Sequence, residues 1–599
     1  MSVGGPGRGG EPTGYDGVMT MPGDAHHRKP PPRLRDRNSR SAWGALLFLL
    51  LQVGLSAQIA GHPVESSRGM VVSAEERATR AGARVLSEGG NAVDAAVAVG
   101  FVLSVTLPAA GNLGGGGFMI IHRPGGGETA LDFRECAPAA ASRNMFLDAG
   151  GKVVPERSRR GLLAVAVPGT VAGLLHAHAK YGKLPRARVL APALRLAREG
   201  FVVSQSLSRS LEAARGLLAG HPESRRIFLG GGEGLEPGAI LRQPELAATL
   251  ERIAREGRAG FYEGATADLI LAEMERGGGL VTAADLRDYR VKERRPLRGS
   301  YRGHEIVSMP PPSSGGVALI EMLNLLETWP ISRLGPGSER TLHLMAECMR
   351  LAFRDRARFM GDPDFTSLPT EKLVSRKYAL SLRRLIGESA SVSRALPEVS
   401  LPAREREETT HFSVMDAAGG AVACTYTLNG SYGSGVTVTG AGFLLNNEMD
   451  DFAAAPGHPN MYGLLQGEAN AVGPRKRPLS SMTPTLVMRG GKVVMVIGSP
   501  GGPTIINTVL QCVMNVLDHR MTIAQAVAAP RIHHQWMPDR IDHERFGINP
   551  DVMRGLRSRG HELRLRGPIG DAHGIFHDPS RGLFQGAADP RHGGVALGP

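Results

Sequence analysis

Two adjacent threonines, Thr409 and Thr410, stand at the start of a segment whose residues alternate as in a β-strand. A threonine hydroxyl is a poor nucleophile unless a base lies beside it. If the chain were cut just before Thr409, that residue would carry both a hydroxyl and a free amine. An α-amine has a reference pKa of about 7.7–8.0, so a sizeable fraction is neutral near pH 7–8 and can accept the hydroxyl proton. The sequence therefore allows nucleophilic catalysis by one terminal residue.

The surrounding residues predict a β-hairpin that would position this threonine. Residues 410–415 and 421–428 are rich in strand-forming side chains, and the glycines between them suit a short loop. If the loop is symmetric about Ala418, Thr427 lies opposite Thr409, with Cβ atoms roughly 4.5–5.5 Å apart. On spacing alone, a threonine pair that only supports the sheet is the more common outcome.

Several long motifs accompany this hairpin along the chain. Besides 409–413 and 425–429, they occupy residues 89–96, 111–117, 132–135, 309–316, 444–452, 476–485 and 498–502. In type and order they resemble the motifs of the γ-glutamyltranspeptidases, over a span from about residue 69 to about residue 591. The joint occurrence of these motifs outweighs the ordinary structural role that each would have by itself.

The resemblance implies an α+β fold, a four-layer αββα sandwich of the N-terminal nucleophile hydrolase type. It also implies that the precursor cuts itself between Glu408 and Thr409. The large piece would then be residues 61–408, and the small catalytic piece would be residues 409–599. In that family pattern, Thr427 hydrogen-bonds the Thr409 hydroxyl and orients it.

A tetrahedral intermediate at Thr409 would need hydrogen-bond donors for its oxyanion. Gly501 and Gly502 lie between an expected strand at 493–497 and an expected helix from about residue 505. Backbone N–H groups at such a turn can point at developing negative charge. Without the family resemblance, a glycine-rich turn that binds nothing would be the preferred interpretation.

A γ-glutamyl substrate presents a carboxylate and an ammonium group, and the resemblance assigns residues to both. Arg134 suits the carboxylate, because a guanidinium binds it through two hydrogen bonds. The remaining expected contacts are hydroxyl donors at Ser480 and Ser481, and ammonium acceptors at Asn429, Glu448 and Asp451. Many bacterial members carry Gln at the position of Glu448, and a carboxylate there should strengthen ammonium binding.

The loop at residues 456–465 resembles the lid over the family's active site, with Tyr462 closing the pocket. Some relatives lack this loop, so its presence favours small γ-glutamyl substrates. The plain alternative is a surface loop without a role in catalysis.

These features predict an enzyme that transfers the γ-glutamyl group of glutathione and similar amides to water, amino acids or peptides, with no cofactor. A first alternative is a cephalosporin-type acylase on the same scaffold, which should lose or reshape the set Arg134, Asp451, Ser480 and Ser481. A second is a non-catalytic surface or binding protein that stays an uncut precursor.

Before residue 409 the sequence predicts mixed α and β structure. We expect a strand at 70–72, then a helix that opens on a capping box from Ser73 to Glu76 and ends at the glycines 89–90. Asn91 should cap the next helix, from Ala92 to about Thr106. Helices should dominate 170–280, whereas the chain after 409 is strand-rich, with a second hairpin about 490–491. The two parts should form complementary halves of one core.

Composition excludes several classes of function. The formal charge of +13 would suit nucleic acid, but arginines are scattered and aromatics make up only 5% of the 599 residues. The four cysteines are far apart, so we expect four buried thiols rather than disulfides. His533 and His534 are too close for the i,i+4 pair of metal ligands on a helix, and no HExxH motif occurs, so the sequence does not support metal catalysis.

The sequence of the N-terminal region predicts a targeting signal. Residues 1–41 form a basic leader rich in Gly and Pro, and residues 42–60 carry no charge. This pattern is typical of a secretory signal, with Gly54 and Ser56 as small residues before a cleavage point. The site is not a clean Ala-x-Ala, so an uncleaved membrane anchor is the alternative. Either interpretation predicts a periplasmic or secreted enzyme.

Overall fold

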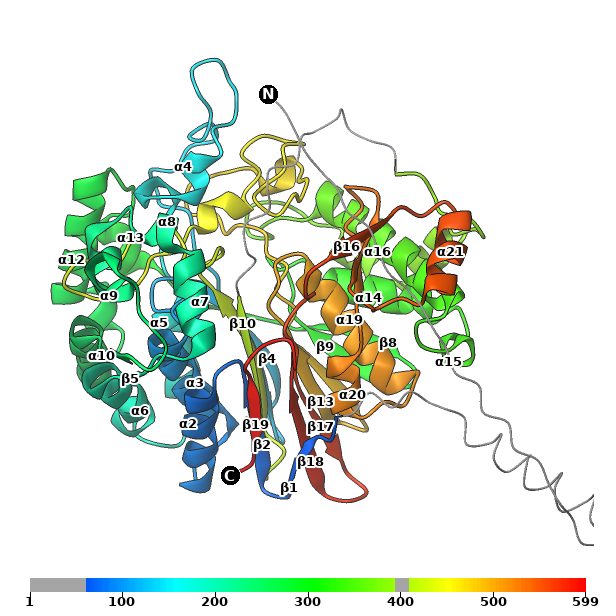
Figure 1. Ribbon diagram of the computed structural model, residues 1–599, viewed down its shortest axis with the longest axis horizontal. Coiled ribbons are helices and arrows are strands. Elements are labelled where there is room, and N and C mark those ends of the chain that lie inside the picture. Colours follow the sequence, from blue (N-terminus) through cyan, green and yellow to red (C-terminus); the bar gives the residue numbers. More distant parts are fainter. Residues whose placement is uncertain (1–60, 394–408) are drawn as a thin grey trace, which may run out of the picture. The chain divides into compact units, whose positions relative to one another are not determined.

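The computed structural model describes residues 61–393 and 409–599 (Figure 1). The predictions for the leader, the signal or anchor segment and Glu408 lie outside these residues. Within the described ranges, no helix is both long and apolar enough to cross a membrane.

Two seven-stranded antiparallel sheets form the centre of the fold (Figure 1). In spatial order, sheet one contains β1 (Val64–Ser66), β18 (Leu583–Ala588), β17 (His573–Asp578), β13 (Lys492–Gly498), β12 (Thr485–Arg489), β9 (His304–Ser308) and β8 (Leu297–Tyr301). Sheet two contains β19 (Val595–Leu597), β2 (Gly69–Ser73), β10 (Thr410–Asp416), β11 (Ala421–Thr427), β3 (Gly116–Arg123), β4 (Gly127–Phe133) and β7 (Lys292–Arg294).

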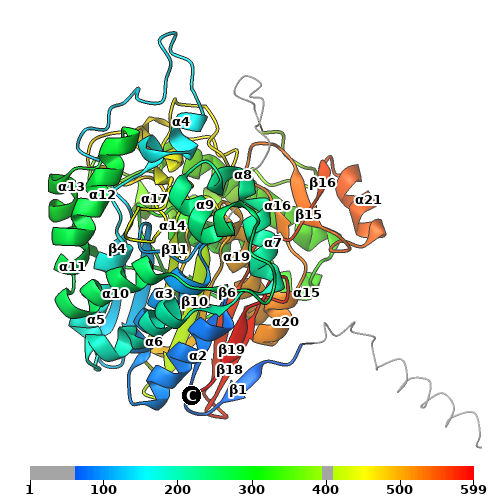
Figure 2. The same cartoon turned by 60° about the vertical axis from the view of Figure 1, so that its left-hand side comes forward.

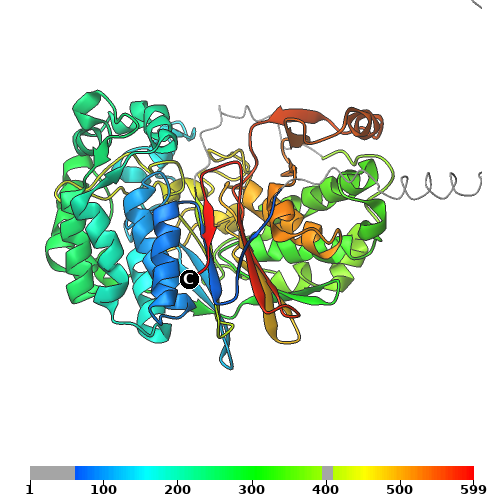
Figure 3. The ribbon, with the colours of Figure 1, turned by 60° about the horizontal axis from the view of Figure 1, so that its bottom comes forward.

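Helices cover the outer face of each sheet, and the two sheets face each other in the middle (Figure 3). On sheet two lie α2 (Glu76–Ser87), α3 (Ala92–Thr106) and α5 (Thr170–Tyr181), with α6 (Arg186–Glu199) and α10 (Pro244–Glu256) outside them (Figure 2). On sheet one lie α14 (Gly315–Leu326), α19 (Thr504–Leu517) and α20 (Ile523–Ala528), and α16 (Glu339–Phe359) packs against α14. The predicted αββα sandwich is therefore confirmed.

Strand alternation divides the apolar side chains between two kinds of core. In β3, Phe118 and Ile120 pack between the sheets against sheet-one residues such as Val307 and Val496. The alternate residues Met119 and Ile121 point outward into the cluster under the helices of sheet two. Each sheet is thus buried on both faces, which explains why its central strands contain few exposed residues.

The structure contains further α-helices and β-strands. They are α7 (Gln205–Ala213), α8 (Arg215–Leu218), α9 (Pro222–Phe228), α11 (Ala259–Tyr262), α12 (Gly264–Gly277), α13 (Ala283–Asp288), α4 (Glu156–Arg159), α15 (Ile331–Leu334), α17 (Thr370–Leu373), α18 (Arg376–Arg383) and α21 (Pro550–Ser558), with β14 (Ile532–His533), β15 (Ile541–Glu544) and β16 (Leu563–Arg566) in a small third sheet, and β5 (Phe201–Val202) paired with β6 (Ile240–Leu241). The helical stretch from 170 to 280 and the hairpin at 490–491 agree with the predictions.

The threonine hairpin has the predicted register. Thr410 pairs with Tyr426 and Met415 pairs with Ala421, so the turn is centred on Ala418. The Asp416 carboxylate stabilises the turn by accepting the backbone N–H groups of residues 418 and 420, at 3.0 and 2.8 Å. Extending the ladder by one step places Thr409 opposite Thr427.

Two local predictions need correction. Asn91 caps α3 in a reciprocal box with Asp94, as expected, but α2 begins later than predicted. Its cap is Glu75, because Ser73 belongs to β2 and pairs there with Phe412. Among the cysteines, Cys136 is only partly buried while the other three are fully buried.

Candidate active site

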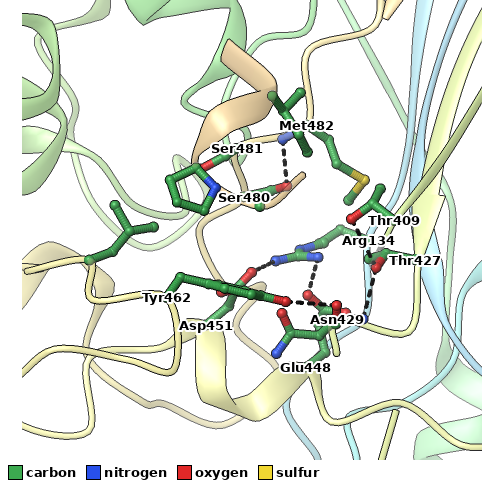
Figure 4. A pocket seen from close by; sticks show the side chains of 14 residues that line it. Arg134, Thr409, Thr427, Asn429, Glu448, Asp451, Tyr462, Ser480, Ser481 and Met482 are labelled. Carbon is green, nitrogen blue, oxygen red and sulfur yellow. Dashed lines mark hydrogen bonds and ion pairs between the residues drawn. The ribbon is translucent and has the colours of Figure 1, made fainter. Parts of the chain in front are cut away.

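The residues predicted to act in catalysis and binding converge on one narrow cavity (Figure 4). Its volume is about 20 Å³, which is room for about one water molecule. It is lined by Arg134, Thr409, Thr427, Asn429, Glu448, Asp451, Tyr462, Leu464, Ser480, Ser481, Met482, Gly502, Pro503 and Ile505. Among the predicted site residues, Gly501 lies beside the cavity without lining it, and Glu408 lies outside the described residues.

Thr409 lies immediately before the first residue of strand β10 and lines this cavity. The odd-numbered residues of that strand face sheet one, as the hydrogen bond from the Ser413 hydroxyl to the carbonyl of His573 shows. The Thr409 and Thr427 hydroxyl oxygens lie 3.3 Å apart. The backbone N–H of Asn429 donates to the Thr427 oxygen at 2.8 Å and fixes that side chain. The two hydroxyls therefore meet, as the register predicts.

The turn before α19 presents two backbone N–H groups near Thr409. Neither Gly501 nor Gly502 donates its N–H to another group within the described residues. Gly501 has a φ of 128°, and a Cβ there would lie 2.4 Å from the Thr504 hydroxyl oxygen. Glycine is therefore required at position 501. The open N–H groups of Gly501 and Gly502 suit a developing oxyanion.

Arg134 lies at the centre of the charged part of the site (Figure 4). It follows the last residue of β4, and its side chain is 1% exposed. One guanidinium nitrogen donates to Glu448 and another donates to Asp451 at 2.5 Å, while Nε donates to the carbonyl of Pro478 at 3.1 Å. The predicted carboxylate binder and two predicted ammonium acceptors thus pair with each other, which the sequence did not indicate.

Burial controls the ionisation of these groups. Burial alone would lower the pKa of Arg134, but the Glu448 and Asp451 carboxylates outweigh it and hold that pKa above its ordinary value. Burial raises the pKa of Glu448 well above its ordinary range, opposed by Arg134. Burial likewise raises the pKa of neighbouring Glu135 to about 7. The charged form of Glu448 therefore depends on Arg134 and on any further cation that binds beside it.

Two serine hydroxyls form the wall opposite the acids. The Ser480 oxygen accepts the backbone N–H of Met482 at 3.1 Å, and the Ser481 oxygen accepts from the Arg356 guanidinium at 3.3 Å. Because both hydroxyl oxygens already accept a hydrogen bond, the serine hydroxyl protons can point to a ligand anion.

Tyr462 and Asn429 close another side of the cavity. The Tyr462 hydroxyl donates to the backbone carbonyl of Asn429 at 2.7 Å, and the tyrosine is 4% exposed. Asn429 adopts a positive φ of 77° and donates its side-chain amide to the carbonyl of Asn447 at 3.0 Å. A hydrogen bond to Asn429, another predicted binding residue, therefore holds Tyr462, the predicted lid residue, over the site.

Sequence reasoning missed some residues of the site. Met482 and Glu135 lie inside motifs that carry the family resemblance, so those motifs could have indicated them. Leu464, Pro503 and Ile505 line the cavity through apolar contacts and have no distinctive pattern. Arg356 comes from the distant helix α16, and no local signal marks it. No cluster of His, Cys, Asp or Glu in the described ranges could hold a metal ion.

Comparison with known proteins supports the resemblance. The family model described as gamma-glutamyltranspeptidase matches residues 78–598. A relative from Escherichia coli K12, named glutathione hydrolase proenzyme, is 47% identical over 88% of this chain and 91% of its own length. An acylase ACY 1 proenzyme from Pseudomonas sp. SE83 is 39% identical over 89% and 94%. A crystal structure of cephalosporin acylase from Bacillus halodurans superposes with a TM-score of 0.80 at 27% identity, covering 90% of this chain and 97% of its own. The chain belongs to the γ-glutamyltranspeptidase family.

Proposed function

We propose that this protein is a self-processing γ-glutamyltransferase and glutathione hydrolase with Thr409 as its nucleophile. The observation that carries the proposal is the joint placement of the Thr409 hydroxyl and the charged set Arg134, Glu448 and Asp451 on one cavity. The name of the Escherichia coli relative supports a glutathione substrate and a proenzyme form.

The proposed first event is self-cleavage. The Thr409 hydroxyl attacks the carbonyl carbon of Glu408, and the C–N bond between the two residues breaks, which leaves an ester and the free α-amine of Thr409. Water then hydrolyses the ester, which releases the Glu408 carboxylate and restores the Thr409 hydroxyl. The large piece is then residues 61–408, and the small piece is residues 409–599. Extensive contact between the pieces, such as the pairing of β10 with β2 and of β11 with β3, would keep them together as a heterodimer.

Turnover then uses the free amine as the base. The Thr409 oxygen attacks the γ-carbonyl of the donor while its proton passes to the amine. The oxyanion accepts the N–H groups of Gly501 and Gly502, and the protonated amine returns the proton to the leaving nitrogen as the C–N bond breaks. Water or an acceptor amine attacks the threonyl ester and restores the enzyme, with Thr427 holding the nucleophile's orientation.

The charge pattern favours a zwitterionic donor. An α-amino acid head can place its carboxylate at Arg134, Ser480 and Ser481, and its ammonium between Glu448 and Asp451. Charges of opposite sign would then alternate, so each buried charge keeps a partner. A glutaryl group lacks the ammonium and would leave two carboxylates facing a third.

The acylase relatives support one second candidate, a cephalosporin-type acylase. That function predicts activity on glutaryl amides that equals or exceeds activity on γ-glutamyl amides. The presence of Arg134, Asp451, Ser480 and Ser481 on the cavity supports the γ-glutamyl function instead.

We also propose a periplasmic or secreted location, based on residues 1–60, with the segment 42–60 acting as a signal or an anchor. Small γ-glutamyl compounds and amino acid or peptide acceptors are the proposed partners. Tyr462 is proposed to move aside when they bind, because the cavity volume of about 20 Å³ is too small for a glutamyl group.

The test compares two chromogenic substrates, γ-glutamyl-p-nitroanilide and glutaryl-p-nitroanilide, with and without a dipeptide acceptor. We expect faster p-nitroaniline release from the γ-glutamyl substrate. Faster release from the glutaryl substrate would favour the acylase, and no release from either would refute both enzymes.

A further inference from the structure

Arg356 is a buried cation that the proposed mechanism does not use. It lies near the C-terminal end of α16 and is 3% exposed. No carboxylate in the described parts of the chain lies within ion-pair distance of its guanidinium, and its Nη1 atom has no hydrogen-bond partner there. A buried, unpaired charge costs several kcal/mol unless something balances it.

The guanidinium is held by two serines. Its Nε donates to the Ser314 hydroxyl oxygen at 2.9 Å, and its Nη2 donates to the Ser481 hydroxyl oxygen at 3.3 Å. Ser314 in turn donates through both its N–H and its hydroxyl to the carbonyl of Ser480, at 2.8 and 2.7 Å. Arg356 therefore supports the serine pair on the cavity wall from behind.

This arrangement fixes the direction of the Ser481 proton. A guanidinium has donors and no acceptor, so Ser481 must accept from Arg356 and its own hydroxyl proton must point elsewhere. Ser481 lines the cavity. A carboxylate bound there would receive that proton in a hydrogen bond and would also lie close to the positive charge of Arg356.

The electrostatic surroundings point to an anion as well. Burial lowers the pKa of Arg356 to about 10, with the Asp451 carboxylate opposing this change and Arg134 adding to it. The group stays protonated at neutral pH. The Asp451 carboxylate, which stabilises the charge of Arg356 electrostatically, is already paired with Arg134. The positive charge of Arg356 therefore has no direct counterion among the described residues.

We propose that Arg356 is a positioning residue for the carboxylate of the donor substrate, acting through the Ser481 hydroxyl. This inference rests on the proposed γ-glutamyl function and adds a second cation to the recognition of the same carboxylate. Arg134 would contact the carboxylate directly, while Arg356 would orient the serine and balance the charge from behind.

The test uses the full chain with γ-glutamyl-p-nitroanilide as substrate and two ligands that compete with it, one of them a competing donor. L-glutamine carries the α-carboxylate, and 4-aminobutanamide is the same molecule without it. For Arg356→Met we expect KM and the inhibition constant of L-glutamine to rise on the order of 10-fold or more, since a hydrogen bond from a charged group is lost. We expect kcat and the inhibition constant of 4-aminobutanamide to change less than about 3-fold.

The matched control is Arg358→Met, two residues along the same helix, where the side chain is exposed. It should leave every constant within about 2-fold of the parent, by the usual size of exposed substitutions. Equal weakening of both inhibitors by Arg356→Met, or constants that match those of the control, would overturn the proposal.

If Arg356→Met does not fold or process itself, Arg356→Lys keeps the charge but cannot bridge both serines. We expect it to raise KM less than the neutral variant would, on the order of 3-fold. In the double variant that combines Arg356→Lys with Ser481→Ala, we expect KM to be no higher than in Ser481→Ala alone. Independent, multiplicative effects would contradict action through Ser481. An inactive parent protein would refute the proposed function, whereas an active parent with unaffected Arg356 variants would refute only this inference.

Discussion

Replacing Asp451 with Asn tests whether the site recognises a substrate ammonium. The Asp451 carboxylate accepts from Arg134 at 2.5 Å through one oxygen and from the Asn460 amide at 3.1 Å through the other. An amide of the same shape offers one acceptor oxygen and no charge. The variant therefore removes a charged acceptor from the cavity without creating a void.

The expected effect follows from the type of hydrogen bond lost. A hydrogen bond to a charged group contributes about 1.5–3 kcal/mol, which corresponds to a factor of about 10 to 150 in affinity. We expect KM for γ-glutamyl-p-nitroanilide to rise within this range. Glutaryl-p-nitroanilide lacks the ammonium, so its KM should change less than about 3-fold, or even fall, because a repelling carboxylate is gone.

The neighbouring residue Asp450 supplies the matched control. It is also buried, but it accepts from the Ser158 hydroxyl at 2.7 Å and pairs with Arg159 rather than Arg134. Asp450→Asn should not discriminate between the two substrates, and thermal unfolding of both variants reports any general damage. If Asp451→Asn weakens both substrates equally, the ammonium assignment of Asp451 is wrong.

Two further variants test the oxyanion site and the response to acid. Gly501→Ala should lower kcat roughly 10²–10³-fold, because the φ of 128° disfavours a side chain and the open N–H would move; Gly567→Ala, at an exposed glycine, is the control, and a kcat within 3-fold of the parent would contradict the assignment. Burial and His343 lower the pKa of His561 from 6.5 to about 4. Between these pH values the unfolded chain binds more protons than the folded one, so the free energy of unfolding falls as pH drops through this window. In thermal unfolding between pH 7 and pH 4, His561→Gln should lessen the loss of stability, whereas the control His592→Gln, at an exposed histidine, should not. If His561→Gln leaves the pH dependence of stability unchanged, His561 is not its cause.

Local patterns predicted much of the fold because neighbouring residues determine them. The register of the Thr409 hairpin follows from a short loop centred on Ala418. The cap of α3 follows from Asn91 and Asp94, three residues apart. The cap of α2 was wrong because tertiary pairing keeps Ser73 in strand β2, and only the assembled sheet reveals that competition.

The candidate site was predicted residue by residue, but its internal pairing was not. Arg134 is separated from Glu448 and from Asp451 by more than 300 positions along the chain. Sequence motifs placed them in one site, and only the fold shows that the guanidinium joins both acids. Arg356 was missed for the same reason, since its contacts to Ser314 and Ser481 join three distant segments.

The central claim is that the bond before Thr409 is broken by the protein itself. N-terminal sequencing and intact mass measurement of the purified full chain test it most directly, with Thr409→Ala as the matched variant. We expect two fragments, the smaller beginning with the threonine at position 409 and ending at position 599, and a single uncut chain in the variant. An uncut parent chain, or a smaller fragment that begins at any other residue, would contradict the account.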